Sequence, residues 1–296
     1  MKHKAIFLAV LLALGLLAGC SAPAVYDQVA ATTLPVYEFT ARLCQGTDIT
    51  VTRLVTESVS CLHDYSLNVT QVRAAEAAQV VVISGAGLEE FMEDGLASAD
   101  ATIDASAGIG IISCEEEEAQ EDEHAHEGHH HEQDPHIWLS PENAMVMAQN
   151  ICDGLCAQFP AYEDTFKSNL ADLTADLEAL QAYGETELAG LSCRELITFH
   201  DGFAYFAACF DLTILKAVEE ESGSEASAGE LKELIGIVRE HDLPAIFTET
   251  NGSTSAASVI SRETGAAVYA LDMAMAGDSY FEAMYHNIDT IKEALG

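Results

Sequence analysis

Short β-type runs alternate with helical patterns on either side of one long helical pattern, and this arrangement restricts the fold more than any other feature of the chain. The long pattern spans residues 162–188. A helix of this length spans about 40 Å, enough to run along two lobes and join them. Its apolar residues recur every three or four positions and therefore share one helix face. They are Tyr162, Phe166, Leu170, Leu173, Leu177 and Leu180.

The alternation of strands and helices predicts parallel sheets joined by crossover helices. Before the long helix we expect strands at 29–33, 49–55 and 80–84, and helices at 35–44, 69–79, 88–96 and 141–159. After it we expect strands at 195–199, 212–218, 244–248 and 267–271, and helices at 202–209, 228–241, 254–264 and 280–295. The predicted fold class is therefore α/β, with two lobes, central and mostly parallel sheets, and one linking helix.

The first twenty residues have the features of an export signal. Lys2 and Lys4 precede an apolar stretch, 5–17, that is too short to span a bilayer. The next residues, Leu17-Ala18-Gly19-Cys20, resemble a bacterial lipobox, so we expect cleavage before Cys20 and its lipidation. The alternative is an ordinary signal peptide. The mature protein would be tethered by lipid to the extracytoplasmic face of the bacterial cell membrane.

The expected division of the chain follows from the export signal and the long helix. It comprises a lipoprotein signal peptide at 1–20, a tether at 21–28, an N-terminal lobe at 29–160, a linking helix at 161–190 and a C-terminal lobe at 191–296.

The charge of the chain indicates what it can bind. A net charge of −37 excludes nucleic acid as a partner, because phosphate binding needs clustered Lys and Arg. The same negative charge suits a cation as the ligand.

Residues 115–133 combine five histidines with nine carboxylates, which are ligand types of zinc. We interpret this stretch as a mobile metal-collecting loop, the alternative being a solvated acidic loop without a metal role. Its histidines are His124, His126, His129, His130 and His131.

Four polar residues occupy equivalent places near the ends of predicted strands or on the connections that follow: His63, His136, His200 and Asp272. In α/β proteins, ligands bind beyond the carboxyl ends of the strands and between lobes. Each residue alone would be an ordinary hydrogen-bonded side chain. Together, three imidazoles and one carboxylate would form a four-coordinate site for a divalent cation.

With these features the chain resembles the substrate-binding lipoproteins of bacterial zinc/manganese ABC importers. The resemblance covers nearly the whole mature chain. It implies metal bound in the interlobe cleft by His63, His136, His200 and Asp272, an ABC importer permease as partner, a monomer, and transport without enzymatic activity. A histidine-rich insertion is typical of the zinc-associated members. The matching segments are Leu62-His63-Asp64-Tyr65, 84–89, Asp134-Pro135-His136-Ile137-Trp138-Leu139-Ser140-Pro141, 199–206 and 277–280.

Some positions leave alternatives open. Cys61-Leu62 stands where the family usually has proline before the first ligand, so Cys61 is a further candidate ligand. Glu249 would line the cleft or support a ligand, and Asp201 would either orient an imidazole or cap a helix. A histidine at position 200 favours zinc, with manganese as the second metal, since manganese-associated members tend to carry glutamate there.

Two other functions fit parts of the sequence. A tethered metal-buffering or cell-adhesion protein would share the site and the anchor. A secreted zinc hydrolase is suggested by 126–130, which formally matches H-E-x-x-H. That motif requires a helix with an apolar side, whereas residues 126–130 lie in an acidic, glycine-containing run, so we expect no enzyme.

Overall fold

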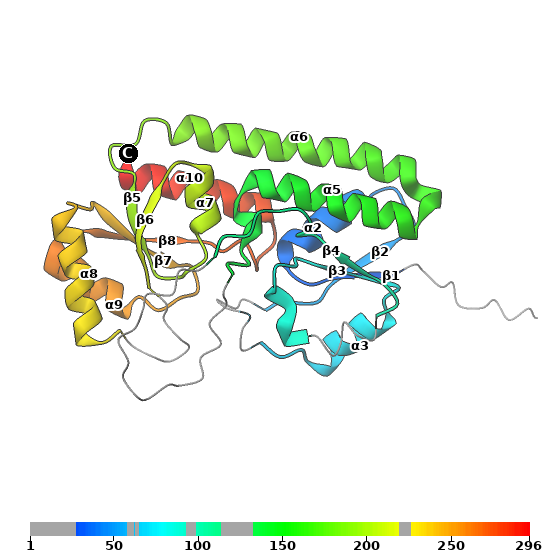
Figure 1. The fold of residues 1–296 in the computed structure, drawn as a ribbon, viewed down its shortest axis with the longest axis horizontal. Coiled ribbons are helices and arrows are strands. Elements are labelled where there is room, and N and C mark those ends of the chain that lie inside the picture. Colours follow the sequence, from blue (N-terminus) through cyan, green and yellow to red (C-terminus); the bar gives the residue numbers. More distant parts are fainter. Residues whose placement is uncertain (1–27, 58–61, 63–64, 93–98, 114–132, 219–225) are drawn as a thin grey trace, which may run out of the picture.

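The computed structural model describes residues 28–57, 62, 65–92, 99–113, 133–218 and 226–296. Within these ranges the chain forms two four-stranded sheets, and every strand pair is parallel. The strand orders are β2-β1-β3-β4 and β6-β5-β7-β8. The two sheets lie in separate lobes placed side by side (Figure 1). This confirms the predicted two-lobe α/β fold.

The first sheet contains β1 (Gln28–Ala31), β2 (Thr50–Arg53), β3 (Val80–Ile83) and β4 (Thr102–Asp104). Its connections carry α2 (Leu34–Leu43), α3 (Val69–Ala77) and a 3-10 helix, η1 (Leu88–Met92). A second 3-10 turn, η2 (Ile137–Leu139), leads into α5 (Pro141–Gln158). The start of α5 agrees with its sequence signal, because the Ser140 side chain accepts a hydrogen bond from the Asn143 amide and Pro141 follows it.

The second sheet contains β5 (Glu195–Thr198), β6 (Thr213–Ala217), β7 (Ala245–Glu249) and β8 (Ala267–Leu271). The helices that accompany it are α7 (Ala204–Cys209), α8 (Ala228–Glu240), α9 (Ser255–Thr264) and α10 (Tyr280–Leu295). The start of α8 has a capping box, in which Ser227 and Glu230 bond to each other's backbone amides.

The helix that joins the lobes is α6 (Glu163–Glu187), preceded by the 3-10 turn η3 (Pro160–Tyr162). It extends along both lobes (Figure 1). Ion pairs fasten it to each side, Arg42 of α2 to Asp176 and Lys292 of α10 to Glu187. Most of its predicted apolar face is buried, although Tyr162 and Leu170 are only partly covered.

One hydrophobic core continues from the first lobe into the second. It includes Phe39 and Trp138 of the first lobe and Phe206 and Tyr280 of the second, all at most 2% exposed. The Phe39 and Tyr280 rings meet edge to face with centroids 5.0 Å apart. The lobes are therefore packed directly against each other as well as joined by α6.

Three details differ from the sequence predictions. β4 was not predicted, because only the middle one of its three residues is buried. The predicted helix at 88–96 is a short 3-10 helix, with residues 93–98 outside the described part. The helix predicted from residue 202 begins at Ala204, so Phe203 and not Asp201 occupies the capping position. Among the described residues, no helix is long and apolar enough to cross a membrane.

Candidate metal centre

His136 is held by a rigid segment of the first lobe. It lies immediately before η2, whose residues Ile137, Trp138 and Leu139 are completely buried, and it is itself only 6% exposed. The Trp138 indole N–H donates to the Met273 carbonyl of the second lobe at 2.7 Å. Burial of this apolar run fixes the position of the His136 backbone at the boundary between the lobes.

The orientation of the His136 ring is set by Asp134. One oxygen of this carboxylate, Oδ1, accepts hydrogen bonds from the His136 amide at 2.9 Å and from His136 Nδ1 at 2.8 Å. A carboxylate oxygen in this position accepts, so the contact favours the tautomer with its proton on Nδ1, in which Nε2 faces away from Asp134 and can bind a ligand.

His200 is the corresponding residue of the second lobe. It follows β5, and its Nδ1 lies 2.8 Å from Oε1 of Glu249, the last residue of the neighbouring strand β7, although their alignment is outside hydrogen-bond geometry. The order β6-β5-β7-β8 makes the gap between β5 and β7 the topological switch point, where ligands bind in open α/β sheets. Burial alone would lower the pKa of His200, but the adjacent Glu249 carboxylate outweighs it and raises that pKa.

The two imidazoles converge on one point from opposite lobes. His136 Nε2 and His200 Nε2 are 3.4 Å apart, and the rings are nearly perpendicular, at 84°. Because each Nδ1 faces a carboxylate, the two Nε2 atoms are the ring nitrogens that face each other. Two nitrogens bound to one tetrahedral zinc ion would lie about 3.3 Å apart, given Zn–N bonds of about 2.05 Å. The observed separation therefore suits a shared cation.

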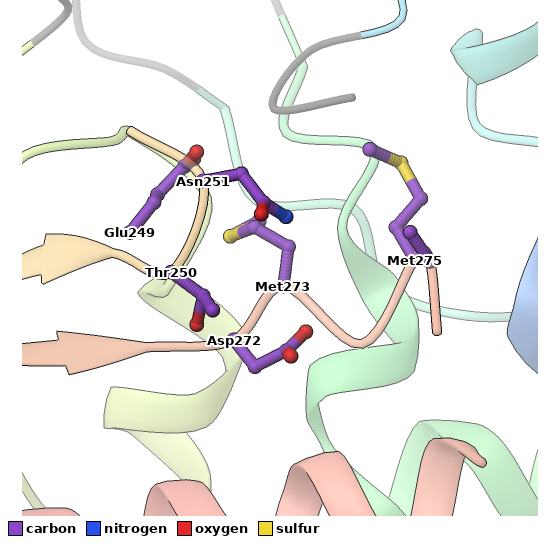
Figure 2. Close-up of a pocket in the computed structure, with 7 residues that line it drawn as sticks. Glu249, Thr250, Asn251, Asp272, Met273 and Met275 are labelled. Carbon is purple, nitrogen blue, oxygen red and sulfur yellow. The ribbon is translucent and has the colours of Figure 1, made fainter. Parts of the chain in front are cut away.

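Asp272 lies directly beyond β8, the strand that pairs with β7, and therefore neighbours Glu249 along the sheet edge. Asn287 of α10 bonds to both the amide and the carbonyl of Asp272, and Asp272 Oδ1 accepts from the Ala274 amide at 2.7 Å. Together with Glu249, Asp272 lines a small pocket of about 10 Å³, room for roughly one water molecule. Figure 2 shows Glu249 and Asp272 among the residues that line this pocket, with Met273 between them.

The structure thus brings His136, His200 and Glu249 together and places Asp272 beside Glu249. Among the residues that it describes, no three His, Cys, Asp or Glu side chains form a group that could hold a metal ion. His63 and Cys61 lie outside the described residues, as do Cys20 and the five histidines of the acidic stretch. Asp201 contributes negative charge near His200.

Sequence reasoning missed two residues that shape the centre, Gly202 and Met273. A Cβ atom on Gly202 would lie 2.5 Å from Met273 Cε, 2.8 Å from His200 Cδ2 and 2.9 Å from His136 Nδ1. Only a glycine leaves room for the two rings and the thioether to meet here. Its conformation is an ordinary one, so no local sequence signal marks the requirement.

Comparison with known proteins agrees with this arrangement. A solved structure titled "Crystal structure of ZnuA" superimposes with a TM-score of 0.76 and 30% identity, over 91% of this chain and 100% of that one. The zinc-bound ZnuA-like domain of Streptococcus pneumoniae AdcA superimposes with a TM-score of 0.75 and 25% identity, over 90% of this chain and 98% of that domain.

Curated relatives extend the agreement to the sequence. The zinc-binding lipoprotein AdcA of Streptococcus pneumoniae serotype 4 is 31% identical over 99% of this chain, which spans 61% of the length of that relative. A putative metal-binding protein of Treponema pallidum is 31% identical, over 84% of this chain and 81% of its own. The sequence model of the family described as "Zinc-uptake complex component A periplasmic" matches residues 29–294. The chain therefore belongs to this ZnuA family, whose members are metal-binding transport receptors and not enzymes.

Proposed function

We propose that this chain captures a zinc ion between its lobes and delivers it to the permease of an ABC-type importer. The observation that carries the proposal is the convergence of His136 Nε2 and His200 Nε2 at 3.4 Å, each ring supported by a buried carboxylate. The names of the relatives support zinc as the cargo, since AdcA is described as zinc-binding and a zinc-bound structure resembles this chain.

The proposed ligands are His63, His136, His200 and Asp272. Asp272 Oδ1 is bonded to the Ala274 amide, so its second oxygen is the atom we assign to the metal. Imidazole and carboxylate ligands suit zinc, and manganese is the second candidate because donor type alone does not exclude it. The site performs no chemistry on its cargo, and the protein atoms replace the water around the ion.

The remaining parts of the proposal concern the rest of the chain. Lipidation of Cys20 would hold the protein, as a monomer, on the extracytoplasmic face of the cell membrane. The histidines of residues 115–133 would collect metal near the site without forming it. The acidic surface would raise the local concentration of cations around the molecule.

A chelator-competition titration of the metal-stripped protein, residues 21–296, tests the binding site. We expect one tight zinc site that manganese displaces poorly and that persists when residues 115–133 are deleted. His136→Ala and His200→Ala should each weaken it by at least 100-fold, because each removes a metal ligand. His241→Ala is the matched control, since this histidine pairs with Glu195 away from the centre, with its Nδ1 3.0 Å from Glu195 Oε2. Tight binding that vanishes with residues 115–133, or that survives both substitutions, would refute the proposal.

Delivery needs a separate measurement. In cells that express this receptor, uptake of isotopically labelled zinc should be lost with His200→Ala and retained with His241→Ala. Unchanged uptake in the absence of the whole receptor would favour a metal-buffering role.

A further inference from the structure

We propose that Asp134 is a positioning residue of the metal centre, which fixes His136 in the one tautomer that can bind the ion. The inference rests on the proposed function, because it assigns a role to a residue beside the proposed ligands. It concerns Asp134 of the first lobe, which neither the sequence motif nor the comparisons assign to the site.

Asp134 makes two hydrogen bonds to His136 through the same carboxylate oxygen. Asp134 Oδ1 accepts from both the amide and Nδ1 of His136, at 2.9 and 2.8 Å, although the two residues are separated only by Pro135. A histidine on a surface can place its proton on either ring nitrogen. With Nδ1 facing an acceptor, the alternative tautomer would place two lone pairs against each other and a proton on Nε2, the nitrogen that faces His200.

Burial and backbone hydrogen bonds hold Asp134 in place. Its side chain is only 2% exposed, and its amide donates to the Ile112 carbonyl at 2.9 Å. Its carbonyl accepts from the Tyr205 hydroxyl at 3.0 Å, and the same hydroxyl accepts from the Ile112 amide at 2.9 Å. Tyr205 belongs to α7 of the second lobe, so both lobes hold the residue that orients His136.

Two carboxylate oxygens at the centre lack a hydrogen-bond partner within the described part of the chain. Asp134 Oδ2 and Glu249 Oε1 are both buried without a hydrogen-bond partner among the described residues. A buried carboxylate oxygen in this state is unfavourable unless a positive charge lies nearby. A divalent cation between the two imidazoles would offset the two carboxylates behind them. Each lobe therefore supplies the same unit, a carboxylate behind an imidazole, as is common at metal sites.

The test compares Asp134→Asn with Asp153→Asn. The first change keeps the shape and one acceptor oxygen but removes the charge and introduces an N–H₂ donor that can face Nδ1. Asp153 lies exposed on α5, where it accepts a hydrogen bond from Gln149, so it is the matched control. Circular dichroism checks that both variants are folded.

Two readouts are required, on metal-free protein labelled with ¹⁵N-histidine and kept at pH 8. Two-bond nitrogen–proton spectra should show His136 of the wild type with its proton on Nδ1, and a population with the proton on Nε2 in Asp134→Asn. Competition titration should show zinc binding weakened about 10- to 100-fold in Asp134→Asn and unchanged in Asp153→Asn. A purely structural role for Asp134 would not change the tautomer.

The outcomes separate this inference from the proposed function. A wild type that binds no zinc tightly, or equally well after His136→Ala, would refute the proposed function. A wild type that binds zinc through His136 but carries the proton on Nε2 would overturn the inference without any variant of Asp134. So would an Asp134→Asn protein that binds zinc as tightly as Asp153→Asn.

Discussion

Single side chains at the meeting point of the lobes determine whether the two imidazoles can converge. Gly202 is the clearest case, because its missing Cβ leaves the space that Met273, His200 and His136 share. Close packing of this kind tolerates little added volume, and overpacking typically costs about 1–3 kcal/mol. The effect should appear first in metal binding, since the displaced groups are the rings themselves.

Gly202→Ala is therefore expected to weaken zinc binding at least 10-fold while the protein remains folded. Gly236→Ala is the matched control, because among the described residues nothing beyond the backbone of α8 itself lies within 4 Å of the added Cβ. Helix propensity predicts a gain of about 0.5–1 kcal/mol in stability. Competition titration and urea unfolding of both variants provide the comparison. Equal zinc affinity in the two would show that the contacts at Gly202 do not position the histidines.

Among the structural elements, the turn after β3 is organised around one buried acid, Glu89. Its carboxylate accepts hydrogen bonds from the Thr32 hydroxyl and from the amides of Ser84 and Gly85. Gly85, Ala86 and Gly87 all have positive φ, so the backbone curls tightly around this side chain. Burial outweighs the three hydrogen bonds and raises the pKa of Glu89 to about 7.

This pKa predicts a pH dependence of stability. Between about pH 4.5 and 7 the folded protein keeps a proton on Glu89 that the unfolded chain releases, so the free energy of unfolding should fall as pH rises through this range. Glu89→Gln should reduce that fall by up to roughly 3 kcal/mol, whereas Glu90→Gln, an exposed neighbour, should not change it. Urea unfolding of metal-free protein at pH 5 and pH 8 measures the difference. An identical pH profile for the two variants would contradict a buried, protonated Glu89.

The helices and strands of the structure also show which parts of the fold can be predicted from the sequence. The long helix and seven of the strands were predictable, because apolar periodicity over many residues is a strong local signal. β4 was not, since a three-residue strand with one buried side chain has almost no pattern. His200 was recognised by its place after a strand, and His136 by its place on the connection between the acidic stretch and the next helix. The space at Gly202 depends on contacts between distant segments, for which no local signal exists. Asp134 lies only two residues from His136, but its burial depends on contacts with Ile112 and Tyr205.

At the scale of the whole molecule, the segment between β8 and α10 ties the lobes together. Arg53 of β2 reaches across to donate to the carbonyl of Gly277 at 2.7 Å and to that of Met275 at 3.2 Å. Tyr280, at the start of α10, donates its hydroxyl to the Trp138 carbonyl at 2.8 Å. These bonds hold the segment that follows Asp272 against the first lobe, so large hinge motion is not expected.

Arg53→Gln should therefore loosen the two lobes. We expect a loss of about 1–3 kcal/mol in stability and a broader calorimetric transition than the single one of the wild type, because hydrogen bonds from a charged donor across the interface are removed. Arg239→Gln is the matched control, since Arg239 bonds to Glu263 of the same lobe on the exposed surface. Identical transitions for the two variants would show that Arg53 does not couple the lobes.

The two sheets share one strand order, and each lobe contributes one imidazole with a carboxylate behind it. The cargo ion would consequently be a crosslink between two half-sites, and neither half could retain it alone. A ligand at 1,000 times its dissociation constant stabilises the folded state by about 4 kcal/mol. Metal binding would thus mainly reduce the relative motion of the two lobes. A transporter that binds only this less mobile form would distinguish the metal-bound from the metal-free receptor without a large conformational change.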